Sequence, residues 1–218
     1  MNSAVIQLLV LAAIAIFLIL RLKNVLGSRE GFEKPPAPAR LPDDRKGRFE
    51  VIEGGPDRDI TDHVPDGSDA ARALAAMKQA EPSFSVSDFL AGARGAYEMI
   101  LMAFEKGELD RIRPFLSDDV EASFAEAIAQ RERDGLTVEA SFLGIKELVL
   151  QDATFTSGSR FGEIAVRFVA DQTYVVRNKA GEIVEGSPRE VKKSRDIWTF
   201  ARQMGSDDPN WQLVATGD

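Results

Sequence analysis

The chain has 218 residues, ordinary apolar content and a net charge of −8, which suits one domain with a core plus further segments. It has no cysteine and a single histidine, His63. That composition excludes disulfides, thiolate metal sites and cysteine nucleophiles, and argues strongly against a histidine-centred triad. Because phosphate backbones repel an acidic chain, nucleic acid is not expected as the main partner.

Residues 3–20 (SAVIQLLVLAAIAIFLIL) carry no charge and are long enough, at roughly 27 Å as a helix, to cross a bilayer. Basic residues follow this run at Arg21, Lys23 and Arg29, and none precedes it. This pattern favours a retained transmembrane helix over residues 3–26, in preference to a cleaved signal peptide or a buried helix. The positive-inside rule then predicts the N-terminus outside and the rest of the chain in the cytoplasm.

Residues 27–82 are rich in proline and charge and have few apolar side chains, so they are interpreted as a linker in which His63 is solvated. Within it, residues 69–81 (DAARALAAMKQAE) have high helix propensity and an apolar edge at Leu74 and Met77. Two interpretations stay open for this segment. It is a short helix that docks on a partner, on the membrane or on the domain, or it is a marginal helix within the tether.

The remaining residues, 83–218, are predicted to form one domain that begins with two helices. Apolar side chains recur at helical spacing in both helices. Ser85 is predicted to cap the N-terminus of the first helix, and Gly107 is predicted to end it. Ser117 and Gly135 have the same two roles in the second helix. In the first helix the small residues of the AGARG stretch, residues 91–95, are interpreted as permitting close approach of another element.

After the second helix the apolar period changes from about 3.6 to about 2, which predicts about four antiparallel strands. We expect a break at Gly144, a turn around residues 179–181, and a final hairpin joined through GSDDPN, residues 205–210. The basic run EVKKSR, residues 190–195, is interpreted as a solvated strand edge, with lipid headgroup contact as the alternative. Helices followed by strands define an α+β fold with the helices on one face of the sheet.

Three stretches of the predicted domain carry a family resemblance: FLAGARGAYEMILMAFEKGELDRIRPFLSDDV, FAEAIAQRERDG and DIWTFARQMGSDDPNWQLVATGD. Over residues 83–218 they resemble the Tim-forty-four-like family, whose best-known members are mitochondrial inner-membrane translocase subunits. Bacterial relatives resemble this chain throughout, with one transmembrane helix, an acidic linker and the domain. The resemblance implies a curved sheet wrapped by helices, like nuclear transport factor two, with an apolar pocket between them.

The resemblance also implies a non-enzymatic adaptor, because the mitochondrial members are scaffolds that hold a chaperone at an import channel. This linker is proline-rich and net acidic, so the family's chaperone-binding segment and tight lipid binding are not carried over. The expectation is a single-pass protein of a bacterial inner membrane that holds partner proteins at the cytoplasmic face. Those partners would be a chaperone or translocation machinery, and neither a metal nor a cofactor is expected.

Two other functions remain as alternatives. The pocket implied by the fold would bind lipid acyl chains or small apolar ligands, although most of its candidate residues are expected simply to fill the core. These candidates are Phe89, Tyr97, Ile100, Phe104, Phe124, Phe168, Tyr174, Trp198 and Trp211. Tyr97, Tyr174 and Trp198 are the better pocket candidates, because each carries a polar atom that needs a partner. The weaker alternative is an enzyme, for which the candidate carboxylates are Asp171, Asp196 and Asp208.

Overall fold

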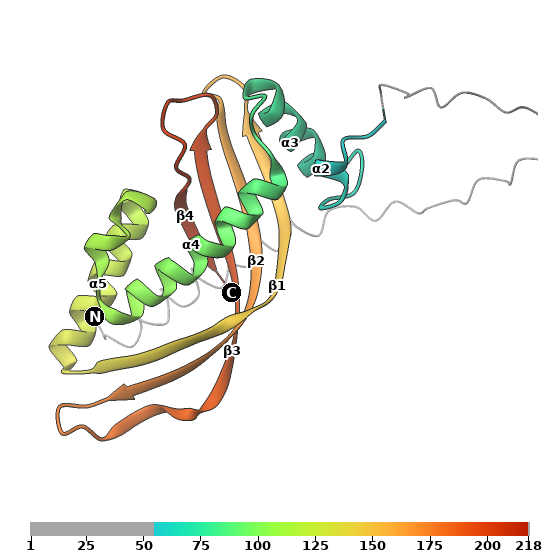
Figure 1. Cartoon of the computed structure of the whole chain (residues 1–218). Coiled ribbons are helices and arrows are strands. Elements are labelled where there is room, and N and C mark those ends of the chain that lie inside the picture. The colour runs from blue at the N-terminus through green and yellow to red at the C-terminus, as the bar shows by residue number, and fades with distance from the viewer. Residues whose placement is uncertain (1–54, 218) are drawn as a thin grey trace, which may run out of the picture. The chain divides into compact units, whose positions relative to one another are not determined.

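The computed structural model describes residues 55–217, which form helices packed on an open four-stranded antiparallel sheet. In Figure 1 the long helix α4 crosses the concave side of the sheet, with α5 beside it and α3 near one end of the strands. The α+β class and the placement of helices against one sheet are therefore confirmed.

The helices begin and end at residues whose side chains or backbone satisfy the helix termini. Helix α4 (Val86–Lys106) follows Ser85, whose Oγ accepts a hydrogen bond from the backbone N–H of Asp88, and ends at Gly107 with φ 73°. Helix α5 (Asp118–Asp134) follows Ser117 and ends at Gly135 with φ 66°. Only glycine adopts this left-handed conformation freely, so both helix ends are fixed by local sequence, as predicted.

Shorter helical segments complete the helical layer. Helix α2 (Arg58–Thr61) and helix α3 (Asp69–Ala80) precede α4. The single turns η1 (Leu109–Arg111) and η2 (Arg113–Phe115) connect α4 to α5. Pro114 lies in the first turn of η2, where its missing N–H has no helical partner to lose.

The sheet is a meander of four strands in sequence order: β1 (Thr137–Thr156), β2 (Phe161–Arg177), β3 (Ile183–Gln203) and β4 (Gln212–Gly217). Register shifts interrupt the pairing of β1 with β2, one of them between Phe142 and Gly144. Gly144 has φ 137°, so the predicted break is a bulge within a continuous strand. Bulges of this kind bend a strand, and the sheet curves around α4 (Figure 1).

The core lies between α4 and the concave face of the sheet. Tyr97 of α4 stacks on Phe168 of β2 with ring centroids 4.3 Å apart, and its ring lies 4.6 Å from that of Trp198 in β3. All three side chains are buried. Aromatic side chains of this size bury large apolar areas, so this cluster fixes α4 on the sheet.

Helix α3 belongs to the folded unit, which corrects the interpretation of residues 27–82 as a linker throughout. Leu74 and Met77 are fully buried, and Met77 lies over Gly162 of β2, where an added Cβ would meet the Sδ of Met77 at 3.1 Å. The absence of a side chain at Gly162 makes room for Met77. Of the two interpretations left open for residues 69–81, the helix that docks on the domain is therefore correct.

His63 also lies within this folded part and is not a fully solvated linker residue. It is half-buried, and its Nε2 is 3.3 Å from the Oγ of Ser87 in α4. Among residues 55–217, no helix is both long and apolar enough to cross a membrane. The predicted anchor at residues 3–26 and the first half of the predicted linker lie outside the described residues.

Candidate functional site: an apolar groove beside helix α4

An open groove of about 470 Å³ runs along the N-terminal half of α4. Its floor is the α4 surface at Gly92, Ala93 and Ala96. Its walls come from the turn between α3 and α4, from η2 and from the segment that leads into β4. The wall residues are Glu81, Ser83, Phe84, Ser85, Asp88, Phe89, Phe115, Arg202, Pro209, Asn210 and Trp211.

Packed aromatic rings form one wall of the groove. The ring centroid of Trp211 lies 4.7 Å from that of Phe89 and 5.9 Å from that of Phe84. Phe89 in turn contacts the core ring of Phe200 with centroids 6.0 Å apart. The wall is therefore a continuation of the core that reaches the surface, with Trp211 at its half-buried outer edge.

A buried ion pair lies against the ring of Trp211. Arg202 is 8% exposed, its Nη2 donates to Glu81 Oε1 at 2.6 Å, and its guanidinium lies 5.3 Å from the centroid of the Trp211 ring. The other Glu81 oxygen accepts from the backbone N–H of Gly205 at 2.6 Å. Burial alone would raise the pKa of Glu81, but the hydrogen bonds from Arg202 and Gly205 outweigh it and lower the pKa.

The Arg202 side chain has one hydrogen-bond donor without an acceptor. Its Nε has no hydrogen-bond partner, and among the described residues only Gln172 Oε1 shares that condition. A buried N–H without an acceptor is unfavourable because it has lost its hydration and gained nothing in return. Arg202 also lines the groove, so an apolar wall and a side chain with one unpaired donor occur at the same site.

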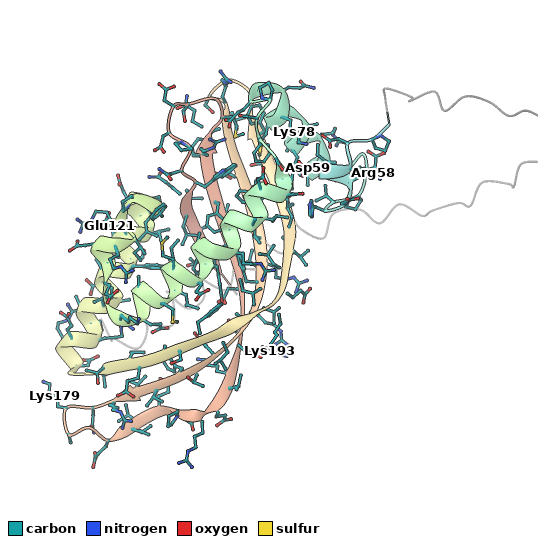
Figure 2. All side chains as sticks on the ribbon, in the orientation of Figure 1. Arg58, Asp59, Lys78, Glu121, Lys179 and Lys193 are labelled. Carbon is teal, nitrogen blue, oxygen red and sulfur yellow. The ribbon has the colours of Figure 1, made fainter. Side chains whose placement is uncertain are left out.

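The start of α4, and with it the groove, is held in place by Asp59 of α2. Its carboxylate accepts from the backbone N–H groups of Val86 and Ser87 at 2.8 and 2.9 Å. Lys78 of α3 approaches the same carboxylate at 2.8 Å, and Figure 2 shows the two side chains side by side. A carboxylate at a helix N-terminus stabilises the helix by satisfying free N–H groups and by interacting with the helix dipole.

The nine residues predicted to line one pocket lie in several separate parts of the structure. Phe89 and Trp211 line the groove, whereas Tyr97, Ile100, Phe168 and Trp198 are buried beneath α4. Phe104 and Phe124 pack on each other between α4 and α5, with centroids 4.5 Å apart. Tyr174 lies farther along the sheet under the Nζ of Lys192. The structure thus brings two of the nine together on an open surface.

The three candidate carboxylates also lie apart from one another, and each interacts with a different residue. Asp196 accepts a hydrogen bond of 2.5 Å from the hydroxyl of Tyr97, Asp171 lies 3.5 Å from Lys146, and Asp208 accepts from the backbone N–H of Asn210. Burial, reinforced by the bond to Asp196, raises the pKa of Tyr97 well above its usual range. Within residues 55–217, no group of three or more histidine, aspartate or glutamate side chains is arranged to hold a metal ion.

Sequence reasoning missed Phe84, Phe115, Glu81 and Arg202. Strand alternation could have found Arg202, because it follows Trp198 and Phe200 at a spacing of two and so shares their inward face. Glu81 had no such signal, since it lies in a turn that only the fold places beside β3. The same holds for Phe115, which reaches the groove from η2.

Helices packed on an open antiparallel sheet, with an apolar groove on the surface, define a small α+β domain. The chain belongs to the Tim44-like domain family, whose profile matches residues 70–218. That match begins within α3, in agreement with the packing of α3 on the sheet.

Two curated relatives are similar to most of this chain. Mitochondrial import inner membrane translocase subunit TIM44-1 of Arabidopsis thaliana is 24% identical over 163 residues, and subunit TIM44 of Homo sapiens is 25% identical over 167 residues. Each alignment covers 72% of this chain but only 34% and 36% of the respective relative, so the chain spans about a third of their length. Among solved structures, the intermembrane space region of chloroplast protein ARC6 aligns with a TM-score of 0.34 and 9% identity, over 50% of this chain and 75% of that one.

Proposed function

We propose that this protein is a non-enzymatic adaptor, anchored in a membrane by residues 3–26, that holds partner proteins at the cytoplasmic face of a bacterial inner membrane. Membership of the Tim44-like domain family supports this proposal, because the relatives named above are translocase subunits. The partners would be a chaperone or components of a translocation machinery. A tether between anchor and domain raises the local concentration of the domain for partners bound to the same membrane.

The location of the apolar surface of the domain is the main support for this proposal. The concave face of the sheet, where this type of fold could enclose a small substrate, is occupied by the packed and buried rings of Tyr97, Phe168 and Trp198. The apolar groove lies instead beside the N-terminal half of α4, where the core reaches the surface, and it is open. An open apolar groove suits a protein segment better than it suits an enclosed reaction.

Chemical crosslinking of the full chain in intact cells, followed by mass spectrometry, tests this function. We expect a reproducible set of protein partners that includes membrane-bound proteins and is linked through residues 55–217. Recovery of no protein above the background of an unrelated protein with the same membrane anchor would contradict the adaptor. A co-purified lipid in place of proteins would favour the alternative function, binding of acyl chains.

A further inference from the structure

The groove beside α4 has space for an occupant that approaches the helix closely. At about 470 Å³, it falls within the size range of ligand sites. A Cβ placed on Gly92 would meet no atom within 4 Å, and the floor residues next to it are alanines. Glycine at an exposed position inside a helix lowers the stability of the helix, but its lack of a side chain allows another backbone to come near. The floor of the groove is therefore shaped for close contact with another chain.

The hydrogen-bonding and charged groups of Arg202 and Glu81 limit the class of occupant that the groove can bind. Arg202 Nε is a buried donor without an acceptor, so a favourable occupant brings a hydrogen-bond acceptor to it. The charge of Arg202 is already paired with Glu81 at 2.6 Å, so a second carboxylate would gain little there and would face Glu81. A neutral carbonyl oxygen satisfies the donor without that repulsion.

A peptide fits this combination better than a hydrocarbon chain. A hydrocarbon chain offers apolar contact but carries its only acceptor at the charged headgroup. A peptide has a carbonyl oxygen at every residue and places apolar side chains beside it. The aromatic wall of Phe84, Phe89 and Trp211 is the kind of surface that receives such an apolar anchor.

We infer that the groove binds a short apolar peptide segment of a partner protein, with an anchor side chain against Phe89 and Trp211 and a main-chain carbonyl bonded to Arg202 Nε. Arg202 Nε is buried, and the guanidinium lies 5.3 Å from the centroid of the Trp211 ring, so the inference includes an outward shift of the indole that admits the carbonyl. The inference rests on the proposed adaptor function and specifies which surface holds the partner. It also assigns a purpose to the small residues at the floor of the groove.

Random twelve-residue peptides displayed on phage are the probe for this site. They are selected against the full chain in phospholipid nanodiscs, so that no detergent competes for the groove. The binding of the selected synthetic peptides is then measured by fluorescence anisotropy. We expect peptides with a leucine or aromatic anchor, and we expect Gly92→Leu to weaken their binding by at least about tenfold, because leucine fills the floor.

Gly95→Leu is the matched control, because Gly95 lies in the same helix, also has open space at its Cβ and does not line the groove. Leucine favours a helix over glycine at both positions, so both variants should fold. The control should bind the peptides within about twofold of the original protein. Arg202→Lys keeps a charge for Glu81 but lacks Nε, so we expect it to weaken binding by several-fold.

Three results would overturn the inference: no peptide is selected, the selected peptides bind Gly92→Leu as well as the original protein, or laurate binds the groove and no peptide does. The adaptor function is judged separately by the in-cell crosslinks. Crosslinked partners that persist in the Gly92→Leu variant would leave the adaptor standing and remove the groove as its binding surface.

Discussion

At the scale of single residues, one carboxylate joins three helices. Asp59 in α2 accepts hydrogen bonds from the first backbone N–H groups of α4 and pairs with Lys78 of α3. Burial would raise the pKa of Asp59, but Lys78 and the N–H groups of Ser87 and Val86 outweigh it and hold the pKa far below its usual value.

We therefore expect Asp59→Asn to lower the free energy of unfolding by about 1–3 kcal/mol at neutral pH. Since the folded-state pKa is depressed, this stabilisation is present above the unfolded pKa of about 3.9 and is lost as the pH falls below it. Urea unfolding at pH 7 and at pH 3 should therefore show a smaller difference between the two proteins at pH 3. Asp62→Asn, at the exposed end of α2, is the control and should unfold like the original. A difference that grows at low pH would contradict this account.

The hydroxyl of Tyr97 gives a second test at this scale. It is bonded to Asp196 at 2.5 Å and to Ser194 at 3.0 Å beneath α4. Tyr97→Phe keeps the stacked ring but removes both bonds, so we expect a loss of about 1–3 kcal/mol in the free energy of unfolding. Tyr174→Phe is the matched control, because its hydroxyl makes no hydrogen bond among the described residues. Equal effects in the two variants would show that the Tyr97 network contributes nothing specific.

At the scale of elements, helix α3 is the part whose role the sequence left open. Its propensity and apolar edge predict a helix, but whether Leu74 and Met77 dock on the domain depends on Gly162, which is far away in the sequence. The caps of α4 and α5 were predictable, because Ser85, Ser117 and the glycines that end these helices act within one turn of their own position.

Truncation tests the contribution of α2 and α3. A fragment of residues 55–218 should unfold cooperatively, whereas a fragment of residues 83–218 loses the burial of Leu74 and Met77 and the Asp59 contacts. Burial of two such side chains contributes about 3–6 kcal/mol, so the shorter fragment should be less stable by at least that amount. Urea denaturation compares the free energies of unfolding of the two fragments, and amide hydrogen exchange compares the protection of β1 and β2. Equal stability of the fragments would restore residue 83 as the domain boundary.

At the scale of the whole molecule, the sequence predicts the class of the fold and only part of the candidate site. The switch in apolar period near Gly135 predicts the order of helices and strands correctly. Phe89 and Trp211 were found because they are large aromatic residues in regular elements or beside them. Glu81, Phe115 and Arg202 meet only after the sheet has curved and α4 has docked, which no local pattern encodes.

Membrane attachment is also a property of the whole molecule. If residues 3–20 anchor the chain, deleting them should move the protein from the membrane fraction to the supernatant. Cell fractionation with a carbonate wash measures this, with the full chain fractionated in parallel. A truncated protein that stays in the washed membranes would contradict a single anchor and point to a second lipid-binding element.

The most direct test of the central claim compares partner recovery between two single substitutions in living cells. Full-length chains carrying Gly92→Leu or Gly95→Leu are crosslinked in cells beside the original protein, and the linked proteins are quantified by mass spectrometry. The account predicts that Gly95→Leu keeps the partners of the original protein, whereas Gly92→Leu loses those that contact α4 while remaining folded and equally abundant. An unchanged set of partners in Gly92→Leu would contradict an adaptor that acts through this groove.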